Sequence, residues 1–297
     1  MVIETANTEL TAAGGAEPSY RRQYRLLESL TRLVALGKAN GLVVVGIPGV
    51  AKSHTVLKTL THLNLVEGTH FSVFKGHTSP LGLFISLWEQ QQRGDVSQLI
   101  VYDDCDSALA NKDGLNLVKA ALDTKPRRII SFVSSKLPSG IPTKFEFSGR
   151  IIFISNLRLS QINDAVCDRV MTAEINLSRS ELFQFIELEV LPHEYLDTTL
   201  GQRAYVLKQM QAALHHSTVR VSVRLYRKLL DLWCHDRDNF HLHLDALLPR
   251  NSEFHMLRRL LDQADTVGEA ATKYHEVTGK SERTFYLLKS RYRDYLD

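Results

Sequence analysis

The chain has 297 residues, of which 44% are hydrophobic and 23% are charged, and its formal net charge is only +3 at pH 7. These values indicate ordinary globular material, large enough for one α/β domain and a smaller second one. The overall charge says nothing firm about nucleic acid, so any basic surface must be local. No apolar run approaches the length of a membrane span, the first residues lack the order of a secretory signal, and the three cysteines are far apart. We therefore expect a cytoplasmic protein with reduced thiols and no membrane association.

The N-terminal part of the chain divides into two predicted segments. Residues 1–18 are rich in small residues and are expected to form a disordered lead-in. Residues 19–37 carry apolar side chains at helical spacing and predict an amphipathic helix that ends near Gly37.

The stretch 46–53 is predicted to bind phosphate. It follows an apolar run of strand length, 42–45, and precedes a helix that opens at His54, which is the strand, turn and helix order that a phosphate-binding loop requires. It matches the pattern G-x-x-x-x-G-K-[ST] except that Ala51 replaces the second glycine. The residues expected to bind the nucleotide are Gly46, Pro48, Gly49, Val50, Ala51, Lys52, Ser53 and His54.

Each part of this loop has an expected role. Backbone N–H groups around Gly49, aided by the helix dipole, would cradle phosphate oxygens. Lys52 would reach the outer phosphates of ATP and Ser53 would bind Mg²⁺. The methyl group of Ala51 is small enough to keep the backbone close to a phosphate.

An acidic strand follows about fifty residues later. Residues 99–104 are four apolar or aromatic side chains that lead into two aspartates, as in a buried parallel strand that delivers carboxylates to its C-terminal end. We expect Asp103 to hold Mg²⁺ and Asp104 to polarise the attacking water. Alternatively, the two acids open a turn and Asp106 caps a helix; the position after a phosphate loop favours the first interpretation.

The next segment contains further expected strands. Residues 71–74 and 151–154 read as strands, and 129–133 with 144–147 read as a hairpin. Asn156 follows the strand 151–154 and is expected to hold the lytic water, although Asn also commonly begins a turn. The hairpin lysines could contact DNA phosphates, or its phenylalanines could simply cover the sheet.

The order of these parts resembles the AAA+ ATPases over about residues 40–235. The resemblance implies that Asn156 is the sensor 1 residue and that Arg169 is the arginine finger that reaches the ATP of a neighbouring subunit. It also implies that Arg224 is the sensor 2 arginine, although Arg220 and Arg227 lie in the same basic run. The family usually has Glu in place of Asp104, whose shorter side chain would slow hydrolysis.

The fold class that this resemblance implies is α/β: a phosphate-loop NTPase parallel sheet with flanking helices, followed by an α-helical lid and a small C-terminal helical domain. The expected division is 1–18 disordered, 19–177 nucleotide-binding domain, 178–250 lid and 251–297 C-terminal domain.

The second half of the chain is predicted to be helical. A capping box at 178–181 precedes a new helix, and further helices are expected at 199–214 and 222–234. The segment 234–243 contains four possible metal ligands without a zinc spacing, so a polar loop between helices is expected there.

The last residues resemble a helix-turn-helix. Helices at 267–274 and 281–291 flank a turn at 278–280, and Phe285 and Leu288 would pack inward. The acidic and basic residues of 253–297 balance, and a helical hairpin that packs on a protein is the alternative. The residues expected to contact DNA are Lys280, Ser281, Arg283, Thr284 and Lys289.

Together these features predict an ATPase that uses ATP and Mg²⁺, assembles into a ring or filament, and acts on DNA as a replication initiator, helicase loader or motor. The layout resembles that of bacterial replication initiators and of ATPases encoded by bacteriophages, and it implies a possible replication protein as partner. The alternative is an ATP-dependent protein remodeller or regulatory scaffold whose C-terminal helices bind a protein. A slow ATP switch is a third reading, since Asp104 is short.

Overall fold

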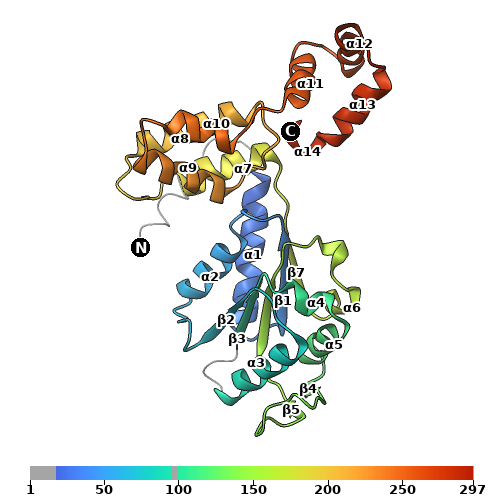
Figure 1. The fold of residues 1–297 in the computed structure, drawn as a ribbon. Coiled ribbons are helices and arrows are strands. Elements are labelled where there is room, and N and C mark those ends of the chain that lie inside the picture. Colours follow the sequence, from blue (N-terminus) through green and yellow to red (C-terminus); the bar gives the residue numbers. More distant parts are fainter. Residues whose placement is uncertain (1–17, 95–98, 297) are drawn as a thin grey trace. The chain divides into compact units, whose positions relative to one another are not determined.

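The computed structural model describes residues 18–94 and 99–296 and is drawn in Figure 1. The chain forms two compact units, residues 1–176 and 177–297. Of the expected disordered lead-in at 1–18, only Pro18 is among the described residues. The expected further division of the second unit at residue 250 remains a prediction.

The first unit is built on a sheet of five parallel strands with the order β2-β3-β6-β1-β7. The strands are β1 (Gly41–Gly46), β2 (Phe71–Lys75), β3 (Leu99–Asp103), β6 (Arg150–Ile154) and β7 (Met171–Ile175). The predicted fold class, an α/β parallel sheet with flanking helices and a helical C-terminal region, is confirmed.

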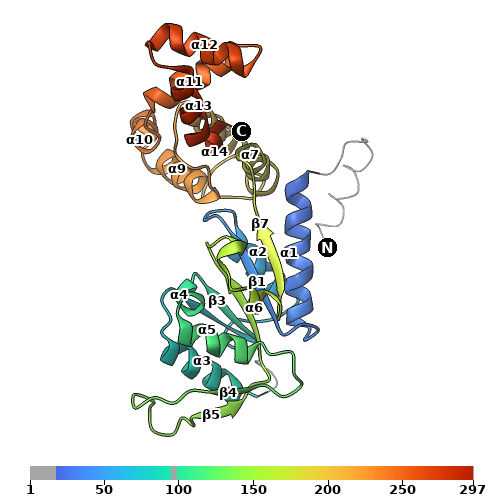
Figure 2. The ribbon, with the colours of Figure 1, turned by 90° about the vertical axis from the view of Figure 1, so that its right-hand side faces the viewer.

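Helices cover both faces of this sheet (Figure 2). They are α1 (Ser19–Ala35), α2 (Lys52–His62), α3 (Pro80–Gln92), α4 (Asp106–Ala110), α5 (Lys112–Ala121) and α6 (Asp164–Cys167). Alternate strand side chains, such as Val43 and Tyr102, share one buried core with α3 and α5. The side chains between them, such as Val44 and Val101, are also buried, on the face where α1 and α2 pack. Burial on both faces explains the continuous apolar runs of the sequence.

The register of the sheet brings three chain segments to one edge. Val44 of β1 and Asp103 of β3 both align with Ile154 of β6. The strands are parallel, so the segments that follow them begin side by side: the loop after Gly46, the acids 103–104, and residues 155–156. Gly46 has a φ of +146°, and a Cβ there would collide with the carbonyl oxygen of Ile175, so only glycine fits at this point.

A small antiparallel hairpin, β4 (Ile129–Ser131) with β5 (Lys144–Glu146), forms a second sheet within this unit. The Phe145 ring centroid lies 5.2 Å from that of Phe84 and 5.3 Å from that of Trp88, both on α3. Phe145 of the hairpin therefore packs against α3 rather than directly on the sheet.

The strand β7 was not expected, because its exposed Met171 and Glu174 weaken the apolar pattern of a five-residue segment. Between β6 and β7, a 3₁₀ turn (Leu159–Gln161) precedes α6, which starts as a separate helix because the Asn163 side chain accepts a hydrogen bond from the Ala165 N–H.

The second unit contains helices and no strand among its described residues. Its helices are α7 (Arg179–Phe185), a π-helical turn (Ile186–Val190), α8 (Leu200–Leu214), α9 (Val223–His235), α10 (Phe240–Leu247), α11 (Ser252–Asp262), α12 (Val267–Thr278), α13 (Glu282–Arg291) and α14 (Arg293–Leu296). The predicted capping box is confirmed: the Ser178 N–H donates to Glu181 Oε2 (2.9 Å) and the Glu181 N–H donates to Ser178 Oγ (3.2 Å).

The last four helices have a core of their own, with Phe254 of α11, Tyr274 of α12 and Phe285 of α13 at its centre. The helix α11 was not among the predicted elements. The polar loop expected at 234–243 is partly wrong, since α10 begins at Phe240 and places His243 on a helix, 2.7 Å from Asp236. Within the described ranges, no helix is long and apolar enough to cross a membrane.

Candidate nucleotide-binding site

The loop between β1 and α2 is curled around the ammonium group of Lys52. Lys52 Nζ donates to the carbonyl oxygens of Gly46 (2.6 Å) and Ile47 (3.0 Å). Gly49 and Ala51 have φ values of +82° and +58°, and this left-handed backbone folds the loop back on itself. Strand, loop and helix thus have the form that the motif predicts, with the lysine at the centre.

The two residues expected to bind Mg²⁺ are in contact. Asp103 ends β3 and is 7% exposed, and its Oδ1 accepts a hydrogen bond from Ser53 Oγ at 2.7 Å. A carboxylate and a hydroxyl are hard oxygen donors of the kind that Mg²⁺ prefers, so these residues fit the ion.

Asn156 connects the phosphate loop to the second acid. Its Oδ1 accepts a hydrogen bond from Lys52 Nζ (3.0 Å), and its Nδ2 donates to Asp104 Oδ1 (2.6 Å). Lys52 is 5% exposed, whereas Asp104 and Asn156 lie at the surface. A buried lysine, a surface amide and a surface carboxylate therefore form one chain of hydrogen bonds across three strand ends.

The backbone turns sharply at Asp104. Its φ is +57°, and its N–H donates to the carbonyl oxygen of Ile154 (2.9 Å). The carboxylate consequently leaves the direction of the strand and points toward Asn156.

Two residues near the site were missed by the sequence analysis. Lys75 ends β2 in register with Asp103, and its Nζ lies 3.9 Å from Asp103 Oδ2. Tyr24 of α1 donates its hydroxyl hydrogen to the carbonyl oxygen of Val50. The position of Lys75 at the end of a predicted strand could have indicated that it lies near the site. No sequence pattern indicates the contact of Tyr24 with Val50.

The remaining residues expected to bind the nucleotide differ in how far their side chains are exposed to solvent. Val50 is fully buried, Pro48 is exposed, and His54 is exposed on the first turn of α2. Val50 thus anchors the loop while Pro48 and His54 face outward.

Arg169 lies two residues after α6 and contacts that helix. Its Nη1 donates to the carbonyl oxygen of Ala165, and its Nε is buried without a hydrogen-bond partner among the described residues. Arg169 makes no hydrogen bond or ion pair with the described residues of the loop 46–53. Its contacts therefore do not connect it to the nucleotide-binding loop of its own chain.

Arg224 belongs to the second unit. It is exposed in the first turn of α9, a helix capped by Ser222, whose Oγ accepts from the Leu225 N–H at 3.0 Å. Of the competing arginines, Arg227 lies over the Tyr195 ring at 5.9 Å from its centroid, and Arg220 is exposed.

The residues expected to contact DNA lie around the start of α13. Ser281 caps this helix, Lys280 and Arg283 are exposed, and Thr284 and Lys289 are half-buried. Gly279 ends α12 with a φ of +68°. The expected inward packing of Phe285 and Leu288 is confirmed, since they are 0% and 4% exposed.

Known proteins resemble the chain in part. No protein-family model matches it. An uncharacterized 36.7 kDa protein of Enterobacteria phage T4, from the nrdC-mobD intergenic region, is 30% identical over 143 residues, which are 47% of this chain and 43% of the phage protein. The match therefore spans less than half of that relative. The solved structure of the Aeropyrum pernix Orc1 protein in complex with DNA aligns over 94% of this chain and 84% of its own, with 11% identity and a TM-score of 0.46.

Proposed function

We propose that the chain is an ATPase of the AAA+ type that binds Mg²⁺–ATP at the loop 46–53. One observation carries this proposal: Asn156 bonds both Lys52 and Asp104 while Ser53 bonds Asp103, so that the catalytic groups expected from three strand ends lie together. If the loop and the two aspartates formed only turns, nothing would require their polar side chains to bond to one another.

The chemistry follows from these contacts. Lys52, now bonded to two backbone carbonyls, would exchange them for phosphate oxygens. Ser53 and Asp103 would hold Mg²⁺, which supplies positive charge beside the phosphates when bound. Asp104, held by the amide of Asn156, would orient and polarise the water that attacks the terminal phosphate.

A ring or filament is proposed because Lys52 is the one lysine or arginine of the loop 46–53, so that a further cation would have to come from outside the loop. The arginine would come from a neighbouring copy, and Arg169 is the candidate, since its Nε lacks a partner among the described residues. Arg224 is the candidate for the lid arginine.

The proposed substrate of the assembly is DNA, in replication initiation, helicase loading or translocation. The support is the exposed polar start of α13, where Lys280, Ser281 and Arg283 face outward above a packed inner face. A protein remodeller would present this helix to a protein instead.

The test is the ATPase rate as a function of protein concentration, with and without DNA. The specific rate should rise with concentration and again with DNA, because the site is completed by assembly. Lys52→Ala should abolish turnover and nucleotide binding. Lys58→Ala is the matched control, since Lys58 is exposed on the same helix and should leave both unchanged. A wild-type protein that binds no nucleotide would refute the proposal, and a rate indifferent to DNA would favour the remodeller.

A further inference from the structure

The helices α11, α13 and α14 border a cleft with a volume of about 530 Å³ in the second unit. Its charged lining consists of three cations, Arg258, Lys289 and Arg293, and one carboxylate, Asp262. Such a volume is in the range of ligand sites, and the excess of positive charge favours an anion. Nothing in the proposed nucleotide site uses this cleft.

Two of these cations are not compensated by the protein. The side chains of Lys289 and Arg293 form no hydrogen bond or ion pair with any residue that the structure describes. By contrast, Arg291, which lies between them in sequence, has its Nη1 3.4 Å from Glu253 Oε2. The uncompensated charge is therefore concentrated on the side of α13 and α14 that faces the cleft.

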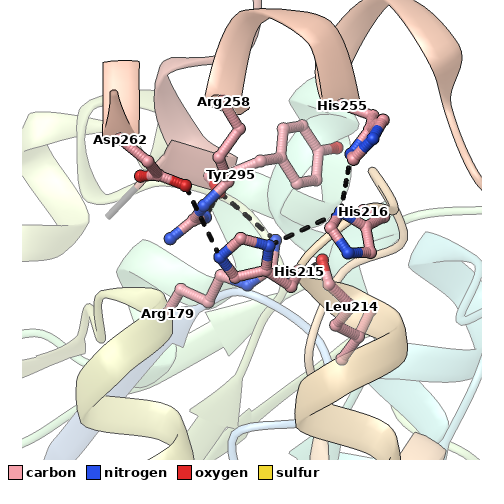
Figure 3. A network of polar contacts seen from close by, with 8 residues as sticks. All are labelled: Arg179, Leu214, His215, His216, His255, Arg258, Asp262 and Tyr295. Atoms are coloured by element: carbon pink, nitrogen blue, oxygen red, sulfur yellow. Dashed lines mark hydrogen bonds and ion pairs between the residues drawn. The ribbon is translucent and has the colours of Figure 1, made fainter. Parts of the chain in front are cut away.

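The third cation is fixed in place. Arg258 Nη1 donates to the carbonyl oxygen of Tyr295 at 3.2 Å, and Arg179 Nη1 donates to the same oxygen at 3.4 Å (Figure 3). The Nε of Arg258 is buried with no hydrogen-bond partner among the described residues. Because the Arg258 guanidinium is already held by one hydrogen bond, it loses little side-chain entropy when it binds a ligand. Its planar N–H donors match the geometry of phosphate oxygens.

The cleft continues the surface of α13 that was proposed to contact DNA. Arg283, Tyr286 and Lys289 recur every three residues and so follow one face of the helix toward Arg293, while Phe285 and Leu288 occupy the buried face. Tyr286 is 48% exposed and lines the cleft. Its ring offers an apolar face against which a sugar of the DNA backbone can pack.

We propose that this cleft binds the sugar-phosphate backbone of DNA, with Arg258, Lys289 and Arg293 around the phosphates of one strand. The proposal rests on the proposed function and deepens it, because contacts to phosphates would fix the register of α13 without reading bases. Free phosphate compounds share the same chemistry, and the experiment separates them from DNA.

The experiment measures the affinity of the full-length protein for a short fluorescein-labelled duplex, by anisotropy, over a series of salt concentrations and with a non-hydrolysable ATP analogue and Mg²⁺ present. Arg293→Gln should weaken duplex binding roughly three- to tenfold. It should also reduce by about one the steepness with which the logarithm of the binding constant falls with the logarithm of the salt concentration. Arg293 is exposed, so its replacement should not disturb folding. Arg291→Gln is the matched control and should bind as the wild type does, because Glu253 already compensates that charge.

The outcomes separate the cleft from the proposed function. If the wild type does not bind the duplex, the DNA part of the proposed function is refuted. If Arg283→Ala weakens binding but Arg293→Gln equals Arg291→Gln, only the cleft proposal is overturned. Calorimetry with inorganic pyrophosphate and with poly-glutamate completes the test. Binding of either that is lost in Arg293→Gln, while duplex affinity is unchanged, would assign the cleft to a small anion or an acidic protein and overturn the proposal.

Discussion

At the scale of single residues, Asp104 and Ala51 share an unusual feature, a left-handed backbone at a residue other than glycine. Apart from glycine, Asp and Asn tolerate this conformation best, because their short polar side chains can bond to nearby backbone groups. Glu lacks this advantage. The local backbone thus gives a physical reason for aspartate rather than glutamate at position 104.

The replacement Asp104→Asn isolates the charge of this side chain. Asparagine keeps the left-handed turn and can still accept the hydrogen bond from Asn156, but it cannot polarise water as a carboxylate does. We expect ATP affinity to remain within a factor of about two and kcat to fall by roughly 10²- to 10⁴-fold. Binding of a fluorescent ATP analogue and phosphate release measure the two quantities.

The control for this variant is Asp113→Asn, an exposed acid in the first turn of α5. It should leave both quantities unchanged. An Asp104→Asn protein with wild-type turnover would remove Asp104 from the reaction and transfer the role to another group.

At the scale of elements, the end of α8 meets α11 through a row of histidines. His215 Nδ1 lies 3.5 Å from His216 Nδ1, which lies 2.7 Å from His255 Nδ1, and His215 Nε2 lies 3.8 Å from Asp262 (Figure 3). Arg179, Arg250 and Arg258 are the other charged groups that face these rings. Burial lowers the pKa of Arg179 to about 10, so it remains charged at neutral pH.

This junction should weaken in acid. Burial, and then the neighbouring positive charges, lower the pKa of His215 and of His216, while Asp262 opposes the shift for His215 alone. A histidine whose folded pKa is lowered contributes stability that is complete above its ordinary pKa near 6.5 and is lost as pH falls through the folded value. The second unit should therefore unfold at lower urea concentration at pH 5.5 than at pH 7.5.

The measurement uses Trp233 fluorescence in a Trp88→Phe background, because these are the two tryptophans and Trp233 reports on α9. His215→Gln/His216→Gln cannot titrate and should show a smaller change in urea midpoint between the two pH values. An equal change in both proteins would show that other groups cause the acid sensitivity.

The elements also show what the sequence could and could not predict. The helix at 19–35 and the buried strands were predictable, because apolar periodicity is a local property. The strand β7 was not, since its burial depends on pairing with β1, as in the alignment of Ala173 with Val44. The candidate site was predicted through its motifs, whereas the bond from Lys52 to Asn156, 104 residues away, depends on strand order, which periodicity does not encode. The cleft depends on α11, which was not predicted.

At the scale of the whole molecule, the proposed mechanism requires two copies for one reaction. In a single chain, Arg169 is satisfied only in part, by the carbonyl oxygen of Ala165. An arginine that stabilises the transferring phosphoryl group is worth about 10³- to 10⁵-fold in rate. If that arginine comes from a neighbour, loss of Arg169 and loss of Lys52 damage different copies.

Mixing two inactive variants tests this division of labour. Arg169→Ala should bind ATP with near wild-type affinity and show no measurable turnover, while Lys52→Ala should bind none. In an equal mixture, some interfaces combine an intact loop from the first protein with an intact Arg169 from the second, so ATPase activity should reappear and increase with total concentration. Arg158→Ala, an exposed arginine of the same region, should retain wild-type turnover alone. Normal hydrolysis by Arg169→Ala would show that Arg169 is not the arginine finger. If light scattering shows that the two variants assemble together but the mixture stays inactive, another arginine of the chain must supply the charge.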